Sequence, residues 1–496
     1  MAIKFKKRPK PKAAPSGNRK SILRTVLAFL IVCLVAVFCY TLLHDLSGPA
    51  VQLEPDSSRA SADQTLRLSM KDSSGLKSVK AIIRYSGEPV TVLDQSFPDA
   101  PREQKVAFSL APANLKDGSF DLEISARDAS WSGFGFGNST TIKRRLTIDS
   151  QPPRIFVRST APNLHRGSVT AIAYSLSEDV VKTGIQVGDI FFPAFLQDNG
   201  LYVCFIAYPI HLTEETFQPE IIAEDGAGNI GRYRPRIHLI KRNFRNDKLN
   251  ISDAFINRKA QDFEEILPGG NLTPLERYIK INNEVRLQNE AVLRDLAAKT
   301  APKMLWSGSF MRLPRSAARA AFGDSRDYMY QNQIIDHQTH MGIDLASVVN
   351  APVPAANNGV VVYAAPLGIY GNLVVIDHGL GLMSLYSHLS HIQVNVGDKV
   401  STGDVIGNTG TTGLAGGDHL HFGILLNGYQ VQPIDWLDIK WIQNTILNRI
   451  QAAAGQPATS LPQTKANIAP KRPKTAQGQP AKAQQPNKRA NTGRRN

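Results

Sequence analysis

Cysteine is scarce in this chain of 496 residues, which contains only three. Cys33 and Cys39 lie in one apolar run near the N-terminus, and Cys204 is isolated. No framework of intrachain disulfides can therefore hold the chain together. Its length allows two to four domains, each large enough to be stabilised by its own buried apolar surface.

Acidic residues are missing from both ends of the chain. Residues 1–24 and residues 451–496 each carry nine Lys or Arg and no Asp or Glu. Of the 57 basic residues, 39 therefore remain outside these tails, against 42 acidic residues. The net charge of +15 thus belongs to the ends, and a globally basic body that binds nucleic acid is excluded.

Charged residues are also absent from residues 25–43. A helix of this length spans roughly 28 Å, close to the hydrocarbon thickness of a bilayer. We predict a single transmembrane helix in the inner (cytoplasmic) membrane. The basic residues 1–24 form its cytoplasmic tail, and the chain beyond it is periplasmic or extracellular. A cleaved signal peptide is the alternative, but its apolar region is shorter and ends at a small-x-small site, whereas His44-Asp45-Leu46 follows here.

Charge-free runs as long as residues 25–43 are absent from residues 55–150, where apolar and polar residues alternate in short runs, as in residues 120–126. This period of two predicts half-buried antiparallel strands. The pattern occurs twice, in residues 55–150 and 151–243, and each copy has an Asp followed by a Gly-Asn pair. We predict two β-sandwich modules. The Ala-x-Asp-x-x-Gly-Asn pattern of the second copy resembles bacterial immunoglobulin-like modules. This resemblance implies that the modules act as a spacer or bind the bacterial cell wall or a partner.

Helical periodicity begins near residue 252 and continues to residue 300. Thr273, Pro274 and Glu276 form a strong helix start, with Thr as the cap, Pro at the first position and Glu at the third. Apolar residues then follow at steps of three and four up to Leu296. We therefore predict a helical connector over residues 252–300.

Large apolar residues are nearly absent again from residues 451–496, which are rich in Ala, Gln, Pro and Lys. Such a segment cannot bury enough apolar surface to offset the entropy of ordering, so we predict a disordered basic tail. Its charge favours contact with anionic envelope polymers or lipid head groups, and a purely solubilising role is the alternative.

Histidine, in contrast, is concentrated, because seven of the eleven histidines lie between residues 337 and 421. His340 and Asp344 are four residues apart. His419 and His421 are two apart in a predicted strand, so both side chains point to one face. A catalytic zinc ion takes three protein ligands and keeps one position for water. These residues supply three ligands with one histidine to spare, and His388 is a further candidate for proton transfer.

Residues 305–437 resemble the lysostaphin-type (LytM-like) zinc endopeptidases of bacterial cell walls. The matching elements follow the family's order: His340-x-Gly342-x-Asp344, Ala355-x-x-x-Gly359, Tyr370-Gly371-Asn372, Tyr386-x-His388-Leu389, Gly397-x-x-Val400-x-x-Gly403, Gly410-x-x-Gly413 and His419-Leu420-His421-Phe422. The resemblance implies that His340, Asp344 and His421 bind one zinc ion, and that His388 and His419 are catalytic residues that do not bind it. It also implies an antiparallel β domain, over residues 305–440, with a groove floored by the metal.

The remaining histidines are interpreted as structural. His337 and His391 are expected in loops near the groove, and His378 beside a turn. His44, His165, His211 and His238 are isolated in the sequence and receive no functional role.

The predicted protein is mainly β, with a transmembrane helix, two β-sandwich modules, a helical connector and a zinc peptidase domain. The resemblance implies that it hydrolyses peptide bonds in peptidoglycan stem peptides or cross-links. The alternatives are a non-enzymatic regulator or scaffold of wall hydrolases, and a peptidase that acts on a protein. The helix at 274–298 packs on its own domain, or it forms an autoinhibitory contact at the groove or a dimer contact.

Overall fold

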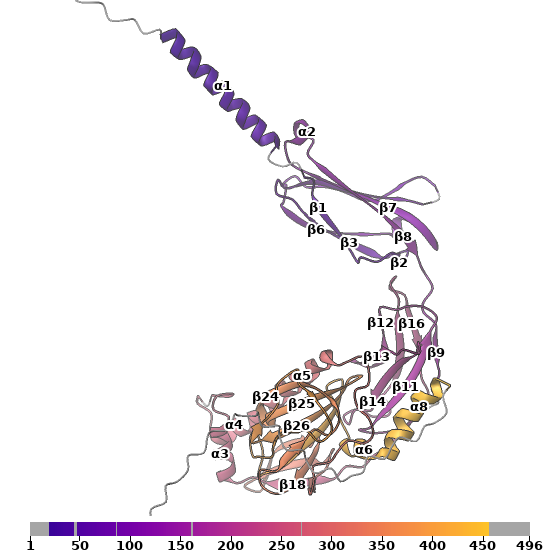
Figure 1. Cartoon of the computed structure of the whole chain (residues 1–496), viewed down its shortest axis with the longest axis vertical. Coiled ribbons are helices and arrows are strands. Elements are labelled where there is room, and N and C mark those ends of the chain that lie inside the picture. Colours follow the sequence, from indigo (N-terminus) through magenta and orange to yellow (C-terminus); the bar gives the residue numbers. More distant parts are fainter. Residues whose placement is uncertain (1–18, 44–46, 86, 160–161, 269, 456–496) are drawn as a thin grey trace, which may run out of the picture. The chain divides into compact units, whose positions relative to one another are not determined.

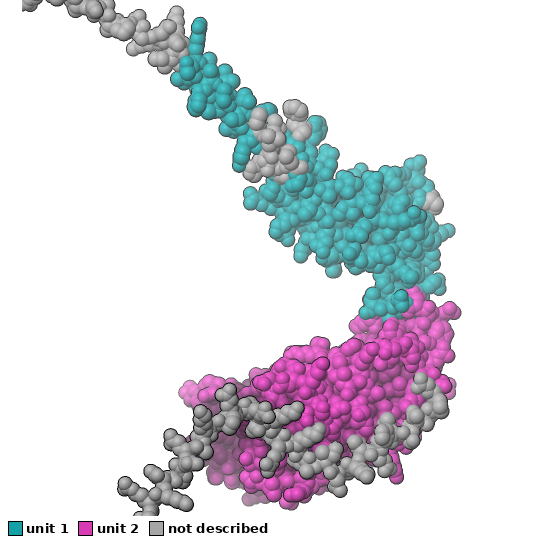
Figure 2. All heavy atoms as spheres, in the orientation of Figure 1, with its two compact units in different colours: residues 1–153, 179–181, 224–230 teal, residues 154–178, 182–223, 231–496 magenta. Residues whose placement is uncertain are grey.

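The computed structural model describes residues 19–43, 47–85, 87–159, 162–268 and 270–455. These residues form two compact units, coloured separately in Figure 2. Unit 1 comprises residues up to 153 with residues 179–181 and 224–230, and unit 2 comprises residues 154–178, 182–223 and those from 231 onwards. Most of the predicted basic tail, residues 456–496, and most of the predicted cytoplasmic tail lie outside the described residues.

The N-terminal helix α1 (Arg19–Leu43) contains the charge-free run of residues 25–43 (Figure 1). Within the part of the chain that the structure describes, no helix is both long and apolar enough to cross a membrane. The membrane anchor therefore stays a prediction.

The first β module, called module 1 and covering residues 50–148, has two sheets that share one core. The first sheet has the strand order β1-β3-β6, and the second has the order β2-β8-β7-β4-β5. Alternate residues of β7 are buried, so Leu122 and Ile124 enter the core while their neighbours face outwards. The strands are β1 (Ala50–Glu54), β2 (Arg59–Ala60), β3 (Thr65–Lys71), β4 (Leu76–Arg84), β5 (Val90–Ser96), β6 (Glu103–Ser109), β7 (Gly118–Asp128) and β8 (Ser139–Ile148), with the short helix α2 (Ser132–Gly135) between the last two.

The second β module, called module 2 and covering residues 155–240, is built on a seven-stranded sheet in the order β16-β15-β12-β13-β14-β11-β9. Strands β10 and β17 pair separately. The bounds are β9 (Ile155–Val157), β10 (Asn163–His165), β11 (Val169–Leu176), β12 (Lys182–Val187), β13 (Ile190–Leu196), β14 (Tyr202–Ala207), β15 (Pro219–Glu224), β16 (Ile230–Tyr233) and β17 (His238–Ile240). Most of its buried apolar residues share one core cluster with residues of the C-terminal domain.

The C-terminal domain contains a large antiparallel sheet in the order β19-β22-β30-β26-β25-β24-β28, with β31 on the edge of β30. Two small sheets, β18-β20-β21 and β23-β29-β27, flank it. The bounds are β18 (Asn246–Asn250), β19 (Ala317–Ala320), β20 (Ser325–Tyr330), β21 (Gln333–Thr339), β22 (Ile343–Ala346), β23 (Pro352–Pro354), β24 (Gly359–Leu367), β25 (Gly371–Gly379), β26 (Leu382–Leu389), β27 (His391–Ile392), β28 (Lys399–Val400), β29 (Val405–Asn408), β30 (Leu420–Leu426) and β31 (Tyr429–Val431).

Both faces of this sheet are covered, which explains why its central strands are apolar throughout. Alternate residues of β25 enter two different cores: Val374 and Ile376 face module 2 and the C-terminal helices, and Leu373 and Val375 face the connector. The C-terminal helices are α6 (Pro433–Leu437), α7 (Ile439–Ile442) and α8 (Asn448–Ala453), with a π-helical turn at residues 443–447. The helix α8 extends into the segment predicted to be disordered, because residues 451–453 are helical.

The connector packs on its own domain. Its helices are α3 (Asp253–Asp262), α4 (Pro274–Lys280) and α5 (Arg286–Leu296), with a π-helical turn at residues 281–285. The predicted helix start is confirmed, because the Thr273 side chain accepts from the Glu276 N–H and the Glu276 carboxylate accepts from the Thr273 N–H. Val285 and Leu293 are buried against the sheet. The connector therefore lies on the sheet face opposite to module 2.

Candidate metal and catalytic site

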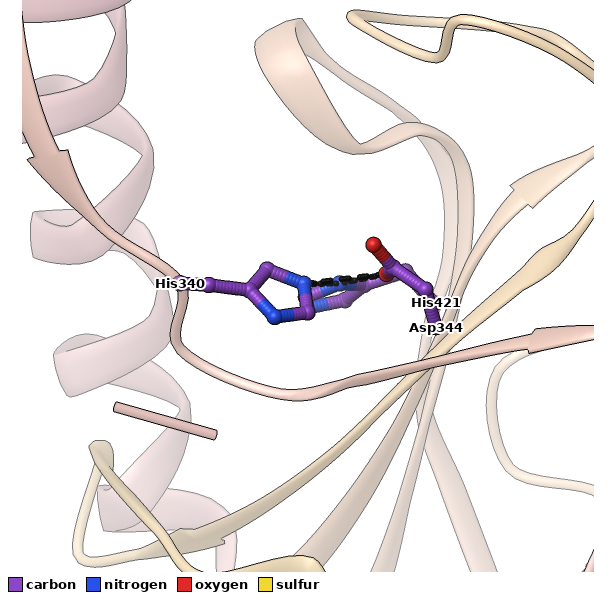
Figure 3. Close-up of side chains that lie close together, drawn as sticks. All are labelled: His340, Asp344 and His421. Atoms are coloured by element: carbon purple, nitrogen blue, oxygen red, sulfur yellow. Dashed lines mark hydrogen bonds and ion pairs between the residues drawn. The ribbon is translucent and has the colours of Figure 1, made fainter. Parts of the chain in front are cut away.

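The predicted ligands meet on the sheet face that carries the connector. Asp344 on β22 is the register partner of His421 on β30, so the two side chains emerge side by side. The neighbours Ile343, Leu345 and Phe422 enter the opposite core, as the alternation of a strand requires. His340 lies in the turn just before β22, and its ring reaches back over the same point (Figure 3).

Three atoms from these residues converge within hydrogen-bonding distance. The Nε2 atom of His340 lies 2.9 Å from Asp344 Oδ1 and 3.0 Å from His421 Nδ1, and His421 Nδ1 lies 2.9 Å from Asp344 Oδ1. A tetrahedral zinc ion bound at about 2.0–2.1 Å separates its ligand atoms by about 3.3 Å. The three atoms are thus spaced almost as a shared metal ion would hold them.

The tautomer of His340 supports this fit. Its Nδ1 atom lies 2.9 Å from the backbone carbonyl of Ala321, which can only accept a hydrogen bond, so the neutral ring carries its proton on Nδ1. The Nε2 atom then offers a lone pair towards a carboxylate oxygen and a second imidazole nitrogen. A cation between these three atoms would offset the repulsion between their lone pairs. A metal-binding histidine usually donates its other ring N–H to a group such as a backbone carbonyl, as His340 does here.

Gly342 is required by this geometry. A Cβ atom at this position would lie 2.5 Å from His421 Nε2 and 2.8 Å from the carbonyl oxygen of Phe422. Any larger residue would therefore displace a predicted ligand. This explains the glycine between His340 and Asp344.

His388 and His419 stand beside the predicted ligands, with their ring centroids 4.9 Å apart. The Nδ1 atom of His388 donates to the Thr412 carbonyl at 2.9 Å, and that of His419 donates to the Gly417 carbonyl at 2.8 Å. Both rings therefore present an unprotonated Nε2 when neutral. The Nε2 of His419 lies 3.5 Å from Asp344 Oδ1.

The backbone of His388 has a φ of +61°, which is unusual for a residue other than glycine. Regular alternation would direct its side chain to the face opposite Ser387, whose register partner is His421. The left-handed conformation instead turns the ring into the cleft beside His421. Such a conformation costs on the order of 1–3 kcal/mol and is often retained at functional sites.

Burial and neighbouring charges set the protonation of these groups. Burial lowers the pKa of His421 to about 4, although its bond to Asp344 opposes this shift. Burial, and then the charges of His419 and His421, lower the pKa of His388 well below its usual value. For His419, burial lowers the pKa but the hydrogen bond and charge of Asp344 outweigh it, so the net shift is upwards. Bonds from the histidines similarly overcome burial and lower the pKa of Asp344.

Two arginines of the site carry no signal in the sequence pattern. Arg326 on β20 donates to Asp344 Oδ2 at 3.2 Å, so the oxygen that faces away from the histidines is also paired. Arg286, the first residue of α5, lines the same cleft together with Tyr370 and Leu414. Both reach the cleft only through tertiary packing, and neither lies within a motif that marks the other residues.

The other histidines lie away from the convergent set. His378 is fully buried and bonds the Asn358 carbonyl and the Ser384 hydroxyl. His337 and His391 lie in strands β21 and β27 and not in loops as predicted, and His337 is exposed and bonds Asp327 at 2.7 Å. Among the described residues of the C-terminal domain, the cluster with metal-binding spacing is His340, Asp344 and His421.

Comparison with known proteins gives a family match to this part of the chain and several similar relatives. Residues 338–433 match the model of peptidase family M23. The chain is 42% identical over 95 residues to the DD-carboxypeptidase/endopeptidase Mpg of Neisseria meningitidis, and 44% identical over 95 residues to the peptidoglycan DD-endopeptidase ShyA of Vibrio cholerae. Each match covers 19% of this chain and 22% of the relative.

A solved structure is also similar to this chain. The catalytic domain of lysostaphin from Staphylococcus simulans is 29% identical, with a TM-score of 0.22, over 25% of this chain and 94% of that domain. The chain spans about a fifth of the length of the curated relatives named above. Each of these matches therefore covers a quarter of this chain or less.

Proposed function

We propose that this chain, whose residues 338–433 form a peptidase family M23 domain, is a zinc endopeptidase of the bacterial cell wall. Its substrates are peptide bonds in the stem peptides or cross-links of peptidoglycan. The name of the relative ShyA, a peptidoglycan DD-endopeptidase, refers to the same polymer. The convergence of His340 Nε2, Asp344 Oδ1 and His421 Nδ1 within 3.0 Å of one another carries this proposal.

His340, Asp344 and His421 would hold the zinc ion. When bound there, zinc lowers the pKa of a coordinated water towards about 7 and polarises the scissile carbonyl. Arg326 keeps the second oxygen of Asp344 engaged, so a single carboxylate oxygen faces the two ligand histidines. The backbone carbonyl of Ala321 fixes the ring of His340 in the tautomer that binds a metal.

His388 and His419 are the residues that transfer protons during hydrolysis. Each ring donates its Nδ1–H to a backbone carbonyl and keeps a lone pair on Nε2. One of them accepts the proton that the attacking water loses, and the same nitrogen can then donate it to the leaving amine. The second donates a hydrogen bond when protonated and stabilises the negative charge that develops on the carbonyl oxygen.

The membrane anchor at residues 25–43 belongs to the same proposal, with the catalytic domain on the periplasmic or extracellular side. The support is the charge-free run preceded by nine basic residues. The connector adds a regulatory element: Arg286 at the start of α5 lines the cleft, so a small displacement of the connector changes access to the site. A dimer contact through residues 274–298 stays a prediction from the sequence.

Digestion of purified murein sacculi by the detergent-purified full chain tests the function, with products identified by mass spectrometry. We expect cleaved stem peptides or cross-links. His388→Ala and His419→Ala should each lower the rate by about 10²–10⁴-fold, because each removes a proton-transfer group. His337→Ala, which changes an exposed histidine outside the cleft, is the matched control and should digest sacculi at the wild-type rate.

A zinc-loaded protein that leaves both sacculi and peptides intact would contradict the enzymatic proposal and favour a regulator or scaffold. Cleavage of proteins but not of sacculi would favour the alternative of a protein substrate.

A further inference from the structure

Modules 1 and 2 close their last hairpin with the same loop base. In module 1, buried Asp128 accepts from the backbone N–H of Ser130 at 3.1 Å and of Asn138 at 2.7 Å. In module 2, buried Asp225 accepts from the N–H of Ala227 at 2.8 Å and of Asn229 at 2.9 Å. In both modules the Asn side chain also donates to the second carboxylate oxygen at 2.9 Å. The two loops are therefore structural equivalents.

Each loop is also tied to the segment through which the chain enters its module. The Asn229 side chain donates to the carbonyl of Asp149 at 2.8 Å, and the Asn138 side chain donates to the carbonyl of Ser47 at 3.4 Å. The loop of module 1 thus lies at the end of the module that receives the chain from α1. Ser47 follows the last residue of α1, Leu43, by four positions, and four residues span at most about 14 Å.

The two loops differ in length and in the side chains that they expose. Ten positions separate Asp128 from Asn138, whereas four separate Asp225 from Asn229. The longer loop carries Trp131 and Phe136, whose side chains are 62% and 69% exposed. No charged residue occurs between positions 129 and 138. Among the side chains described between residues 47 and 153, these are the large hydrophobic ones that stand exposed.

We propose that this aromatic loop, residues 129–138, inserts into the head-group region of the bilayer that holds residues 25–43. The inference rests on the membrane anchor included in the proposed function. Tryptophan is enriched where membranes meet water, because its ring is apolar and its N–H still finds a polar partner. Phenylalanine adds apolar surface, and the uncharged loop pays no cost for removing ions from water.

Because the anchor already holds the protein at the bilayer, two aromatic side chains are sufficient for the loop to insert. A helix that already spans the bilayer keeps the loop at a high local concentration near the lipid, so weak insertion is not opposed by the entropy of bringing the protein to the surface. The loop then fixes the orientation of module 1 on the membrane. The equivalent short loop of module 2 bonds to Asp149 and lacks aromatic residues, so it offers no comparable apolar surface to a membrane.

Quenching of tryptophan emission by lipid tests this proposal. The full chain is reconstituted in nanodiscs of phosphatidylethanolamine and phosphatidylglycerol, with and without bromine on the acyl chains near the head group. The chain has four tryptophans; Trp306 and Trp436 are buried in the core of unit 2, and Trp441 is partly buried against it. We expect brominated lipid to remove up to roughly a quarter of the emission, and Trp131→Ser to abolish that loss.

A matched control places an exposed tryptophan elsewhere. Val349, which is 80% exposed in unit 2, is changed to Trp in the Trp131→Ser background and should show no quenching. Equal quenching in the wild type and in Trp131→Ser would overturn the proposal. Failure of the chain to elute with nanodiscs would overturn both the anchor and the loop. Quenching that depends on Trp131 supports the loop even in a preparation that digests no murein, which would count against the peptidase alone.

Discussion

The two β modules share a sequence pattern and a loop base, yet they differ in what their cores contain. The core of module 1 is closed, which means that all of its buried residues, from Leu53 to Ile148, belong to module 1 itself. The core of module 2 continues into the C-terminal domain: the rings of Phe205 and Trp436 lie 6.5 Å apart, and the Gln432 N–H donates to the Gly167 carbonyl at 2.8 Å. A repeated strand pattern therefore specifies a module, but not whether that module is an independent unit or part of a larger one.

Removing the ring that joins module 2 to the C-terminal domain should have the largest effect. Trp436 is fully buried and also contacts Trp306 and Phe310. We expect Trp436→Ala to lower the free energy of unfolding of unit 2 by about 3–5 kcal/mol. Calorimetry of the full chain should show module 2 and the C-terminal domain melting together at a lower temperature, with the transition of unit 1 unchanged.

Leu122→Ala in module 1 is the converse change. Leu122 is fully buried in the closed core, so we expect a loss of about 2–5 kcal/mol confined to unit 1. If either substitution shifted both transitions by similar amounts, the distinction between a closed and a shared core would be wrong.

The loop base of module 1 should have a smaller effect. Asp128→Ala removes the acceptor for the backbone N–H groups of Ser130 and Asn138 and leaves them without their carboxylate partner. We expect the free energy of unfolding of unit 1 to fall by about 1–3 kcal/mol. Denaturant unfolding followed by circular dichroism measures it, and an unchanged midpoint would show that the carboxylate does not hold this loop.

Lowering the pH should reduce the free energy of unfolding of unit 2 but not that of unit 1, and this difference is smaller still. Burial lowers the pKa of His378 to about 4 in folded unit 2, while the unfolded value is about 6.5. Between these values the unfolded chain binds more protons, so the stability conferred by neutral His378 is present above pH 6.5 and is lost as the pH falls. We expect unit 2 to lose about 1–2 kcal/mol between pH 7 and pH 5 through this group.

The described residues of unit 1 contain no histidine and provide the internal reference for this measurement. His378→Asn retains a donor for the Asn358 carbonyl and should make the pH dependence of unit 2 less steep, leaving the parts that His388 and His421 contribute. The same slope in the variant and the wild type would assign the acid sensitivity to other groups.

The parts of the site that the sequence predicts are those set by short-range geometry. His419 and His421 share one strand face by the period of two, and His340 and Asp344 lie four residues apart around a tight turn at Gly342. The Thr273 cap is likewise a local interaction. These elements depend on few neighbours, so their residue types reveal them.

The remaining features depend on packing between distant segments. Arg326 reaches Asp344 because the β20–β21 hairpin lies beside the site, and Arg286 lines the cleft because the connector packs on the sheet. The left-handed turn of His388 and the core shared by module 2 also arise only in the assembled domain. No periodicity or motif in the sequence encodes these contacts.

The metal content of purified protein tests the central claim most directly. Mass spectrometry of the metal should find one zinc ion per chain in the wild type, in His337→Ala and in His388→Ala. It should find essentially none in His340→Ala, Asp344→Ala or His421→Ala. A full equivalent of zinc in any of these last three variants would contradict the assignment of the ligands.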